Sequence, residues 1–371
     1  MAKHRIMSVG QDPVRDVMSP YDPVARAEDA RLRAETRLTG TIADFSLDAN
    51  ARLDDRTRLL LAQVLGAIVG AIEWDIRRHA ARLLAAGGAT KAGEAMLRAG
   101  AESVIDRLTR AGLLRDEELM DELIARVRHD LIAASLPVEV AEPDEASLLV
   151  RLAGVPDSVV ASAASALLAA ESRRRVSNEQ GSVGGSELPA DLHHRLVWWV
   201  AAAVRDGLQS VTHESDRAIT DAAQRSLAAH DEGERPDAVA MRLAAALDAR
   251  PNELPAVLVE SIGDRRLSLF VAVLAHAVGI AFDQARAITL DPEGDRLWLA
   301  LRAMDLDRPT IARIGFALSE ADPRRDIEAF ADTLDAIVSV EVEDARATLV
   351  PLALSRDFRM ALRALARTDR R

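Results

Sequence analysis

The stretch Leu119–Leu131, which reads LMDELIARVRHDL, decides the fold class, because an apolar residue recurs in it at every fourth position. That interval follows the 3.6-residue turn of an α-helix and gathers the apolar side chains on one face. The same helical spacing recurs along the chain in four sets of residues: Leu119, Leu123, Val127 and Leu131; Leu254, Val257, Leu258 and Ile262; Ile311, Ile314, Gly315 and Leu318; Ile327, Phe330, Leu334 and Ile337. Each set predicts an amphipathic helix with one buried face.

The composition favours the same fold class. The chain has 371 residues, of which 49% are hydrophobic, 29% are charged and only 3% are aromatic. Alanine, the strongest helix former, makes up roughly a fifth of the residues, whereas the aromatic residues that favour strands are scarce. The sequence therefore predicts an all-α protein of stacked antiparallel helix pairs, that is, a HEAT-like α-solenoid or helical-repeat array in two blocks.

The charge balance and the missing residue types exclude several classes of function. A net charge of −12 argues against a general binder of nucleic acid or anionic membranes. The chain has no cysteine, so disulfides, thiolate nucleophiles and cysteine-ligated metals are excluded. Only two lysines occur. Residues 87–92 around Lys91 lack the Gly-Lys-Ser/Thr ending of a phosphate-binding loop, which argues against a P-loop nucleotidase.

The sequence gives no sign of a targeting or membrane-spanning segment. Met1–Gly10 has two cations but no apolar stretch behind them, so it does not resemble a secretory signal. The longest apolar runs, Leu59–Ile72 and Leu267–Phe282, are shorter than the roughly 20 residues that span a bilayer. We therefore expect two buried helices, no membrane span and a cytoplasmic protein.

Aspartate–proline pairs mark predicted helix starts. Asp291-Pro292 and Asp322-Pro323 place an N-cap acceptor before a proline at the first helical position, and Asp307 before residues 308–309 does so less closely. The two pairs also open a shared Asp-Pro-x-x-Asp frame. Helix pairs of about 30 residues are the size of a stacked repeat.

Composition divides the chain into five segments. We expect a disordered tail at 1–23, which contains three prolines and no periodicity, and a charged, helix-prone arm at 24–50. Two helical blocks follow, at 51–172 and 188–371. A flexible linker at 173–187 is expected between them, because three arginines there lead into a run of Ser, Gly, Asn and Gln.

Two stretches carry a family resemblance. Leu59–Leu84 contains an apolar helix followed by Glu73, a short gap, and a tail rich in arginine and alanine. Leu297–Ala303 is followed by a turn and by Thr310–Leu318. Together they resemble the opening and the later part of an alphaproteobacterial family known only as a domain of unknown function. The resemblance would cover most of residues 50–335 and implies a helical-repeat fold related to HEAT arrays. It implies no catalytic residue and no activity.

The adjacent pair Trp198-Trp199 is the most unusual combination of side chains. Two neighbours on a helix cannot both face one core, so at least one should lie at a seam or on an exposed patch. Packing between neighbouring helices is one interpretation. The other is a binding hot spot for a protein partner or a second copy of the chain, helped by the nearby Arg195 and Arg205.

Two arginine doublets, Arg265-Arg266 and Arg324-Arg325, lie at predicted helix starts or turns. They could form a ridge for an acidic partner, but solvated turn residues are the simpler interpretation.

No set of residues has the spacing of a catalytic or metal site. The histidines include no i, i+4 pair, and His213 with Glu214 and Asp216 fits a helix cap better than a metal site. His276, within an apolar helix, fits a core histidine. The acidic clusters at 116–122 and 291–295 fit helix starts. We expect no catalytic residue, no metal, no cofactor and no nucleic-acid partner.

Two hypotheses about function follow. The first is a non-catalytic intracellular scaffold or signalling adaptor that presents a groove or an edge to another protein or to its own copy. The alternative is a sensor that binds a small anionic ligand, such as a nucleotide or cyclic dinucleotide, in an arginine-lined cleft between the two blocks. A hydrolase or metal enzyme is a third reading, for which no motif is present.

Overall fold

The fold is all-α throughout the part of the chain that the structure describes. A computed structural model describes residues 53–98, 102–137, 146–180 and 187–355, together with 358, 359, 361, 362 and 365. Within these residues there are sixteen α-helices, three short 3-10 helices and no strand. The predicted all-α class is therefore confirmed there. The predicted tail at 1–23 and arm at 24–50 lie outside the described residues.

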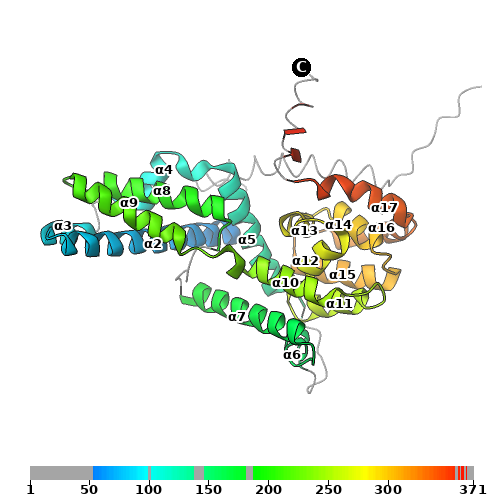
Figure 1. The fold of residues 1–371 in the computed structure, drawn as a ribbon. Helices are drawn as coiled ribbons and strands as arrows, with labels where there is room; N and C mark the ends of the chain where they lie inside the picture. The colour runs from blue at the N-terminus through cyan, green and yellow to red at the C-terminus, as the bar shows by residue number, and fades with distance from the viewer. Residues whose placement is uncertain are drawn as a thin grey trace, which may run out of the picture.

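The helices are short except for α2, α5, α7 and α8 (Figure 1). In chain order they are α2 (Asp55–Ala86), α3 (Thr90–Leu97), α4 (Val104–Arg110), η1 (Leu113–Arg115), α5 (Glu117–Ser135), α6 (Leu148–Ala153), α7 (Ser158–Gln180), α8 (Ala190–Asp206), α9 (His213–Ala228), η2 (Glu232–Glu234), α10 (Pro236–Leu247), α11 (Leu254–Gly263), α12 (Leu267–Val278), α13 (Phe282–Thr289), α14 (Asp295–Ala303), α15 (Arg308–Ala321), α16 (Ile327–Val338), α17 (Val342–Leu349) and η3 (Val350–Ala353).

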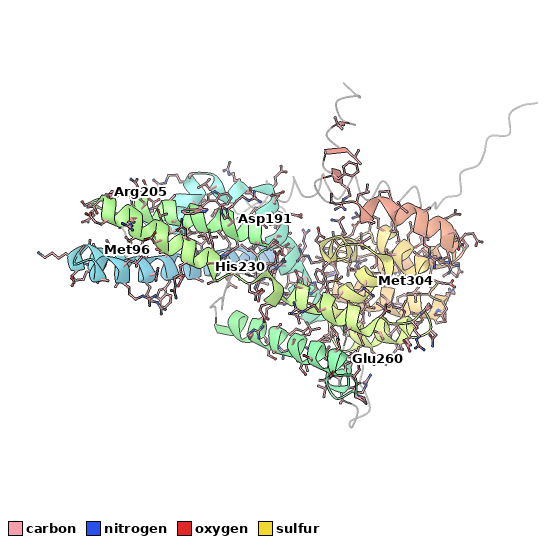
Figure 2. The ribbon with its side chains drawn as sticks, viewed as in Figure 1. Met96, Asp191, Arg205, His230, Glu260 and Met304 are labelled. Atoms are coloured by element: carbon pink, nitrogen blue, oxygen red, sulfur yellow. The ribbon has the colours of Figure 1, made fainter. Side chains whose placement is uncertain are left out.

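Two separate clusters of buried apolar side chains divide the molecule. The α2 module consists of α2, α3, α4, α8 and α9 with the first half of α5, and the α12 module consists of α6, α7 and α10–α17 with the end of α5. α5 therefore joins them, since Val127 belongs to one cluster and Ile132 to the other. Figure 2 labels Met96 at the outer end of the first module and Met304 within the second.

The modules cut across the predicted blocks 51–172 and 188–371. α8 and α9 come from the second block but pack on α2, whereas α6 and α7 come from the first block but pack on α11 and α10. The reason is that the apolar faces of α8 and α7 are buried in different cores. Leu196 and Val200 on α8 complete the first core, and Leu167 on α7 is buried in the second.

The predicted flexible linker at 173–187 is helical in its first part. α7 continues to Gln180, well beyond the three arginines that were expected to begin the linker. Arginine is a good helix former, and the side chain of Arg174 is buried beside Asp130 of α5, which holds this part of α7 against the body. Residues 181–186 lie outside the described residues.

One predicted helix start is confirmed and two are wrong. Asp307 caps α15, which has a proline in its first turn. α14 and α16 begin three and four residues beyond Pro292 and Pro323. The reason is that Asp291 and Asp322 are buried and pair with arginine side chains, so neither carboxylate acts as the predicted cap.

The two longest apolar runs occupy different environments. α12 is surrounded on all sides, with nine of its twelve residues buried, whereas only ten of the 32 residues of α2 are buried. Within the described part of the chain, α2 is the single helix that is long and apolar enough to cross a membrane. α12 and α13 would qualify only as one pair, and that pair is bent by 116°. The lack of a membrane span remains a prediction.

Candidate functional site

Eight charged side chains meet where the two modules join. α5 contributes Glu122, Arg126 and Asp130, which recur every four residues and therefore share one helix face. We call the whole set the junction cluster: Glu122, Arg126 and Asp130 of α5, Arg174 of α7, Glu187 before α8, Arg235 and Asp237 at the start of α10, and Arg286 of α13. Four arginines thus face four carboxylates.

Arg286 connects α13 to carboxylates of two other helices. Its two Nη atoms donate hydrogen bonds to both carboxylate oxygens of Glu122, and Nη1 lies 3.6 Å from Asp237 Oδ2. Arg235 Nη2 lies 3.0 Å from the same Asp237 oxygen. Burial by itself would raise the pKa of Asp237, but Arg286 and Arg235 outweigh burial and lower it. Asp237 is therefore ionised at neutral pH. The bidentate pair between Arg286 and Glu122 fixes α13 against α5.

Arg174 connects α7 to the same face of α5. Its Nη2 atom lies 3.0 Å from Asp130 Oδ1, and its Nε atom lies 3.5 Å from Glu187 Oε2. Burial by itself would lower the pKa of Arg174, but Asp130 and Glu187 raise it above its ordinary value. α7 is consequently held to the junction by a permanently charged side chain.

Arg126 has hydrogen-bonding capacity that the described residues leave unfilled. Its side chain is 6% exposed, and Nη2 lies 2.8 Å from Glu187 Oε2 in an ion pair that lacks hydrogen-bond geometry. Its Nε and Nη1 atoms are buried without a hydrogen-bond partner. Burial, together with the charge of Arg174, lowers the pKa of Arg126. Leaving such a donor unpaired costs about 1–3 kcal/mol.

A small polar cavity borders Arg126. Its walls are junction-cluster side chains together with His129 and Pro236, and it has room for about one water molecule. His129 Nε2 lies 3.0 Å from the hydroxyl of Ser268 on α12, and burial lowers the pKa of His129 to about 4. The imidazole is therefore neutral at neutral pH. The cavity suits a single water molecule, because the positive and negative charges that line it balance.

A stacked pair of histidines lies in the α2 module. His193 of α8 stacks on His230, with ring centroids 4.2 Å apart (Figure 2 labels His230). Both ring nitrogens of His193 are buried without a hydrogen-bond partner. Burial, and then the neighbouring His230, lower the pKa of His193 to about 4. This pair stays uncharged at neutral pH.

The predicted tryptophan pair packs against its own module. Trp198 and Trp199 are both half-buried on α8 and contact the core of the α2 module. Trp198 Nε1 donates to His194 Nε2 over 3.2 Å. Arg195 pairs with Asp116, at 2.8 Å between Nη1 and Oδ2, and with Glu118. These contacts agree with the first interpretation, packing between neighbouring helices. The hot spot for a protein partner remains a prediction.

Each of the predicted arginine doublets bonds within the chain. Arg265 has a positive φ of 58° and donates from Nε to Leu136 O at 2.6 Å, and Arg266 pairs with Glu171 of α7. Burial raises the pKa of Glu171 despite this pairing. These side chains tie the start of α12 to α5 and α7. The doublets and the α8 residues belong to separate parts of the fold.

Arg324 and Arg325 join two turns of the α12 module. Arg324 Nη2 lies 2.7 Å from Asp322 Oδ2, and Arg325 Nη2 donates to Thr289 O at 2.6 Å. The guanidinium of Arg325 also lies 5.6 Å from the ring centre of Trp298. Arg325 is buried, and its Nε and Nη1 atoms have no hydrogen-bond partner. The two Asp-Pro frames noted in the sequence are therefore neighbours in space.

Other predicted constellations have structural roles or differ from prediction. In the described part of the chain no three His, Asp or Glu residues lie close enough to hold a metal. Asp216 pairs with Arg205 at 2.7 Å, and Thr212 caps α9. His276 was expected in the core, but it is exposed and lies 3.1 Å from Asp248. Position 276 lies in the last turn of α12, just beyond the buried run 267–275.

Exposed apolar side chains gather at the end of the chain. The described residues from 358 onwards are helical, and Phe358, Leu362 and Leu365 are 53%, 44% and 65% exposed. Their i, i+4, i+7 spacing places them on one helix face. Arg359, between them in sequence, is buried and donates to Leu352 O at 2.9 Å, which ties the segment to η3.

Comparison with known proteins places the chain in a family. The model of the family DUF2336, described as an uncharacterised protein conserved in bacteria, matches residues 138–350. The chain belongs to this family. The DUF2336 match contains the motifs at Leu297–Ala303 and Thr310–Leu318, whereas Leu59–Leu84 lies before it. No curated protein and no solved structure matches the chain.

The junction cluster was not found by sequence reasoning, although signals for it exist. Glu122, Arg126 and Asp130 follow one another at helical intervals of four, which is a charged stripe that alternates in sign along one face of an amphipathic helix. Arg174 was assigned to a linker by its composition. Only the packing of α7 and α13 on α5 shows that these charges face one another.

Proposed function

We propose that the protein is a non-catalytic cytoplasmic scaffold or adaptor, which binds a protein partner through the apolar helix face formed by Phe358, Leu362 and Leu365. Exposed apolar side chains on one face of a helix are the arrangement that inserts into a groove of another protein. The junction cluster would serve this function by holding the two modules in one relative orientation.

The charge of the terminal segment specifies the chemistry of the partner. Residues 351–371 contain six arginines and two aspartates, a net charge of +4, in a chain whose net charge is −12. The remaining residues 1–350 therefore carry −16. An apolar stripe amid arginines complements a hydrophobic groove with an acidic rim. This segment lies beyond the family match, which ends at residue 350.

The finer fold assignment, a HEAT-like array of stacked helix pairs, belongs to the same proposal. It is supported by the Asp-Pro turns before α14 and α16, which begin at Asp291 and Asp322 and therefore lie 31 positions apart. Arg324 and Arg325 of the later turn donate to Leu290 O and Thr289 O beside the earlier one. Equivalent turns of successive helix pairs stack in this way in repeat proteins.

The test is site-specific cross-linking followed by reconstitution. A photoreactive phenylalanine analogue at position 358 of the full chain should capture a partner in the native cell. The purified partner should then bind the wild-type chain and lose at least a hundredfold in affinity for the triple variant Phe358→Ser, Leu362→Ser, Leu365→Ser, because such residues are interface hot spots. Val159→Ser is the matched control, since Val159 is an exposed apolar residue on α7.

Two outcomes would contradict this function. An affinity that changes less than threefold in the triple variant would remove the terminal face from the interaction. Binding of the wild-type chain to anionic vesicles, lost in the triple variant, would assign the face to a lipid surface instead.

One observation favours the alternative function, a sensor of a small anion. Arginines do gather between the modules, and Arg126, which lines the junction cavity, has two buried side-chain nitrogen atoms without a hydrogen-bond partner. The cavity holds about one water molecule, so a nucleotide would require the modules to separate. Thermal unfolding with phosphate, nucleotides or cyclic dinucleotides at 1 mM discriminates the two, because a ligand of the native state raises Tm. A rise in wild type that Arg126→Gln abolishes would favour the sensor.

A further inference from the structure

α15 and α16 lie side by side and run antiparallel. Arg308, in the first turn of α15, has its Nε atom 2.7 Å from Asp335 Oδ1, near the end of α16. Further along, the rings of Phe316 on α15 and Phe330 on α16 meet, with their centres 5.5 Å apart. The residue numbers rise along one helix as they fall along the other, so the two helices flank each other in opposite directions.

The outer side of this contact exposes apolar side chains. Ile327 and Ala331 lie two turns and one turn before Asp335 on the same face of α16, and that face flanks α15. Ile327 is 45% exposed, and Ala331 is exposed as well. Phe316, on the α15 side, is 40% exposed. We call Phe316, Ile327, Ala331 and Asp335 the α15–α16 seam.

The seam contains a side chain that rests on a rigid support. The ring of Phe330, which Phe316 contacts, is buried and packs on the backbone of Gly315, where a Cβ atom would have no room. Its other neighbour is Trp298, with ring centres 4.5 Å apart. Phe316 therefore lies on a fixed aromatic surface. A side chain that is already ordered loses less conformational entropy when a partner binds.

The surroundings of the seam are acidic. Glu320 on α15 and Glu328 and Asp332 on α16 are exposed, and they have no ion-pair partner among the described residues. Glu328 and Asp332 each follow a seam residue directly in the sequence. Residues 326–345 contain seven acidic residues and no lysine or arginine. Such a surface fits a partner that combines exposed apolar side chains with a positive net charge.

The terminal segment of this chain has that chemistry. Residues 351–371 carry a net charge of +4, and their apolar face from Phe358 to Leu365 is exposed. At the helical rise per residue this face extends over about 10 Å, and the seam from Ile327 to Asp335 extends over about 12 Å. The two faces therefore match in length and are opposite in net charge.

The terminal segment of a chain does not cover the seam of the same chain. Arg359 is buried and donates to Leu352 O at 2.9 Å and to Leu354 O, which ties the segment to η3. In this position Phe358 and Leu365 are exposed, and so are the apolar seam residues. Both complementary faces of one chain are thus open, and a second copy can supply the partner for each.

We propose that the α15–α16 seam binds the terminal segment of a second copy of this chain. The inference rests on the proposed function, because it names the protein that the face formed by Phe358, Leu362 and Leu365 contacts. Each copy offers one seam and one terminal segment, so a reciprocal exchange between two copies closes into a two-fold dimer. The contact joins the two α12 modules.

The first experiment measures the mass of the full chain in solution. Sedimentation equilibrium at 100 μM in 0.1 M NaCl should give at least twice the 40.1 kDa of one chain. The seam variant Phe316→Ser, Ile327→Ser should raise the dissociation constant roughly tenfold or more, because a few apolar anchors dominate the affinity of an interface. Both residues are exposed, so the circular dichroism spectrum should remain that of wild type. The control Val159→Ser should associate as wild type does.

A second seam variant keeps every apolar side chain and changes only the charge. Glu328→Lys, Asp332→Lys should also raise the dissociation constant roughly tenfold or more, since it turns attraction of a basic segment into repulsion. The matched control is Asp191→Lys, Asp221→Lys, which reverses two exposed acids of the α2 module. Salt should weaken the wild-type association, because it screens the charges. A wild type that is monomeric at 100 μM, or an association that neither seam variant weakens, would overturn the proposal.

The third experiment identifies the two surfaces and uses the natural absence of cysteine. Chains with Ala331→Cys and chains with Leu365→Cys are mixed and treated with a short bismaleimide. The proposal predicts cross-links between the two kinds of chain. It predicts none above background in either kind alone, or when Val159→Cys replaces Ala331→Cys. A chain with both cysteines that stays monomeric and links to itself would show that the segment folds back on its own seam, and would overturn the second copy.

The failure of this inference differs from the failure of the proposed function. The photoreactive residue at position 358 could capture a different protein, whose affinity falls in the terminal triple variant and not in the seam variants. That result would overturn the second copy and leave the proposed function standing. Self-association that is lost in the seam variants and in the terminal triple variant alike supports both. Self-association that survives the terminal triple variant overturns this inference, whereas the captured partner decides the proposed function.

Discussion

α2 and α12 are both strongly apolar helices, yet they are used in opposite ways. α12 is surrounded by α10, α11, α13, α14 and α5, so that nearly its whole circumference is buried. α2 has neighbours on one side and an open face of small residues between Leu59 and Trp74 on the other. The difference teaches that the hydropathy of a helix shows how much apolar surface it has. Whether other helices of the same chain bury that surface depends on the tertiary packing.

The largest effect is expected in the core around α12. Phe270→Ala should lower the free energy of unfolding by about 3–5 kcal/mol, because Phe270 is fully buried and its removal leaves a cavity. Leu59→Ala, on the open face of α2, should change it by no more than about 0.5 kcal/mol in dilute protein. Urea unfolding followed by circular dichroism measures both. An equal loss of unfolding free energy in the two variants would contradict the difference in burial between α12 and α2.

The next effect concerns the ion pairs that join the two modules. Glu122→Gln should lower the free energy of unfolding by about 3 kcal/mol, since it leaves the buried Arg286 with only Asp237 as a carboxylate partner. The double variant Glu122→Gln, Arg286→Met should recover part of this loss, because no charge is then left unpaired there. Urea titration of both variants tests it. A loss below about 1 kcal/mol would mean that water solvates the junction.

Acid should weaken each module through a buried histidine. The pKa values of His129, beside α12, and His193, on α8 behind α2, fall to about 4 from an ordinary value of 6.5. Between these pH values the unfolded chain binds protons that the native state does not, so stability falls as pH drops. Each histidine should contribute about 1.5 kcal/mol of loss between pH 6.5 and 5.

The matched variants for this pH effect are His129→Gln and His193→Gln. Each removes one titrating group, so urea unfolding at pH 6.5 and 5 should show a smaller difference than in wild type. His129→Gln keeps a donor for Ser268 of α12. A pH dependence equal to that of wild type in both variants would show that other groups cause it.

The smallest effect should differ in sign between the two sides of α2. Gly70→Ala should raise the free energy of unfolding by about 0.5–1 kcal/mol in dilute protein, because the added Cβ meets nothing and alanine favours the helix. Gly93→Ala, on α3 where it packs on α2, should lower it, because its Cβ would lie 2.9 Å from Ala81 O. Thermal melts of the two variants measure the signs. A loss of stability in Gly70→Ala would mean that the face is already covered.

Particular residues show how far the sequence could predict the site. Arg195 was chosen as a possible partner contact beside the tryptophan pair, and Arg266 and Arg324 as part of a ridge for an acidic partner. All three do pair with acids, but within their own chain. Arg174 was assigned to the predicted linker, and Arg126 was not singled out at all. Ion pairs between residues far apart in sequence leave no local signal, so only packing shows which charges meet.

By itself, the sequence determined that the described part of the chain is helical, because the 3.6-residue spacing of apolar side chains depends only on neighbouring positions. It also determined which residues had to be covered. The tertiary structure alone decided the partition into modules, since α8 and α9 return to α2 across the predicted boundary at 173–187. It also decided that the arginines of the junction cluster lie inside the molecule, because burial of a charge depends on where distant carboxylates arrive.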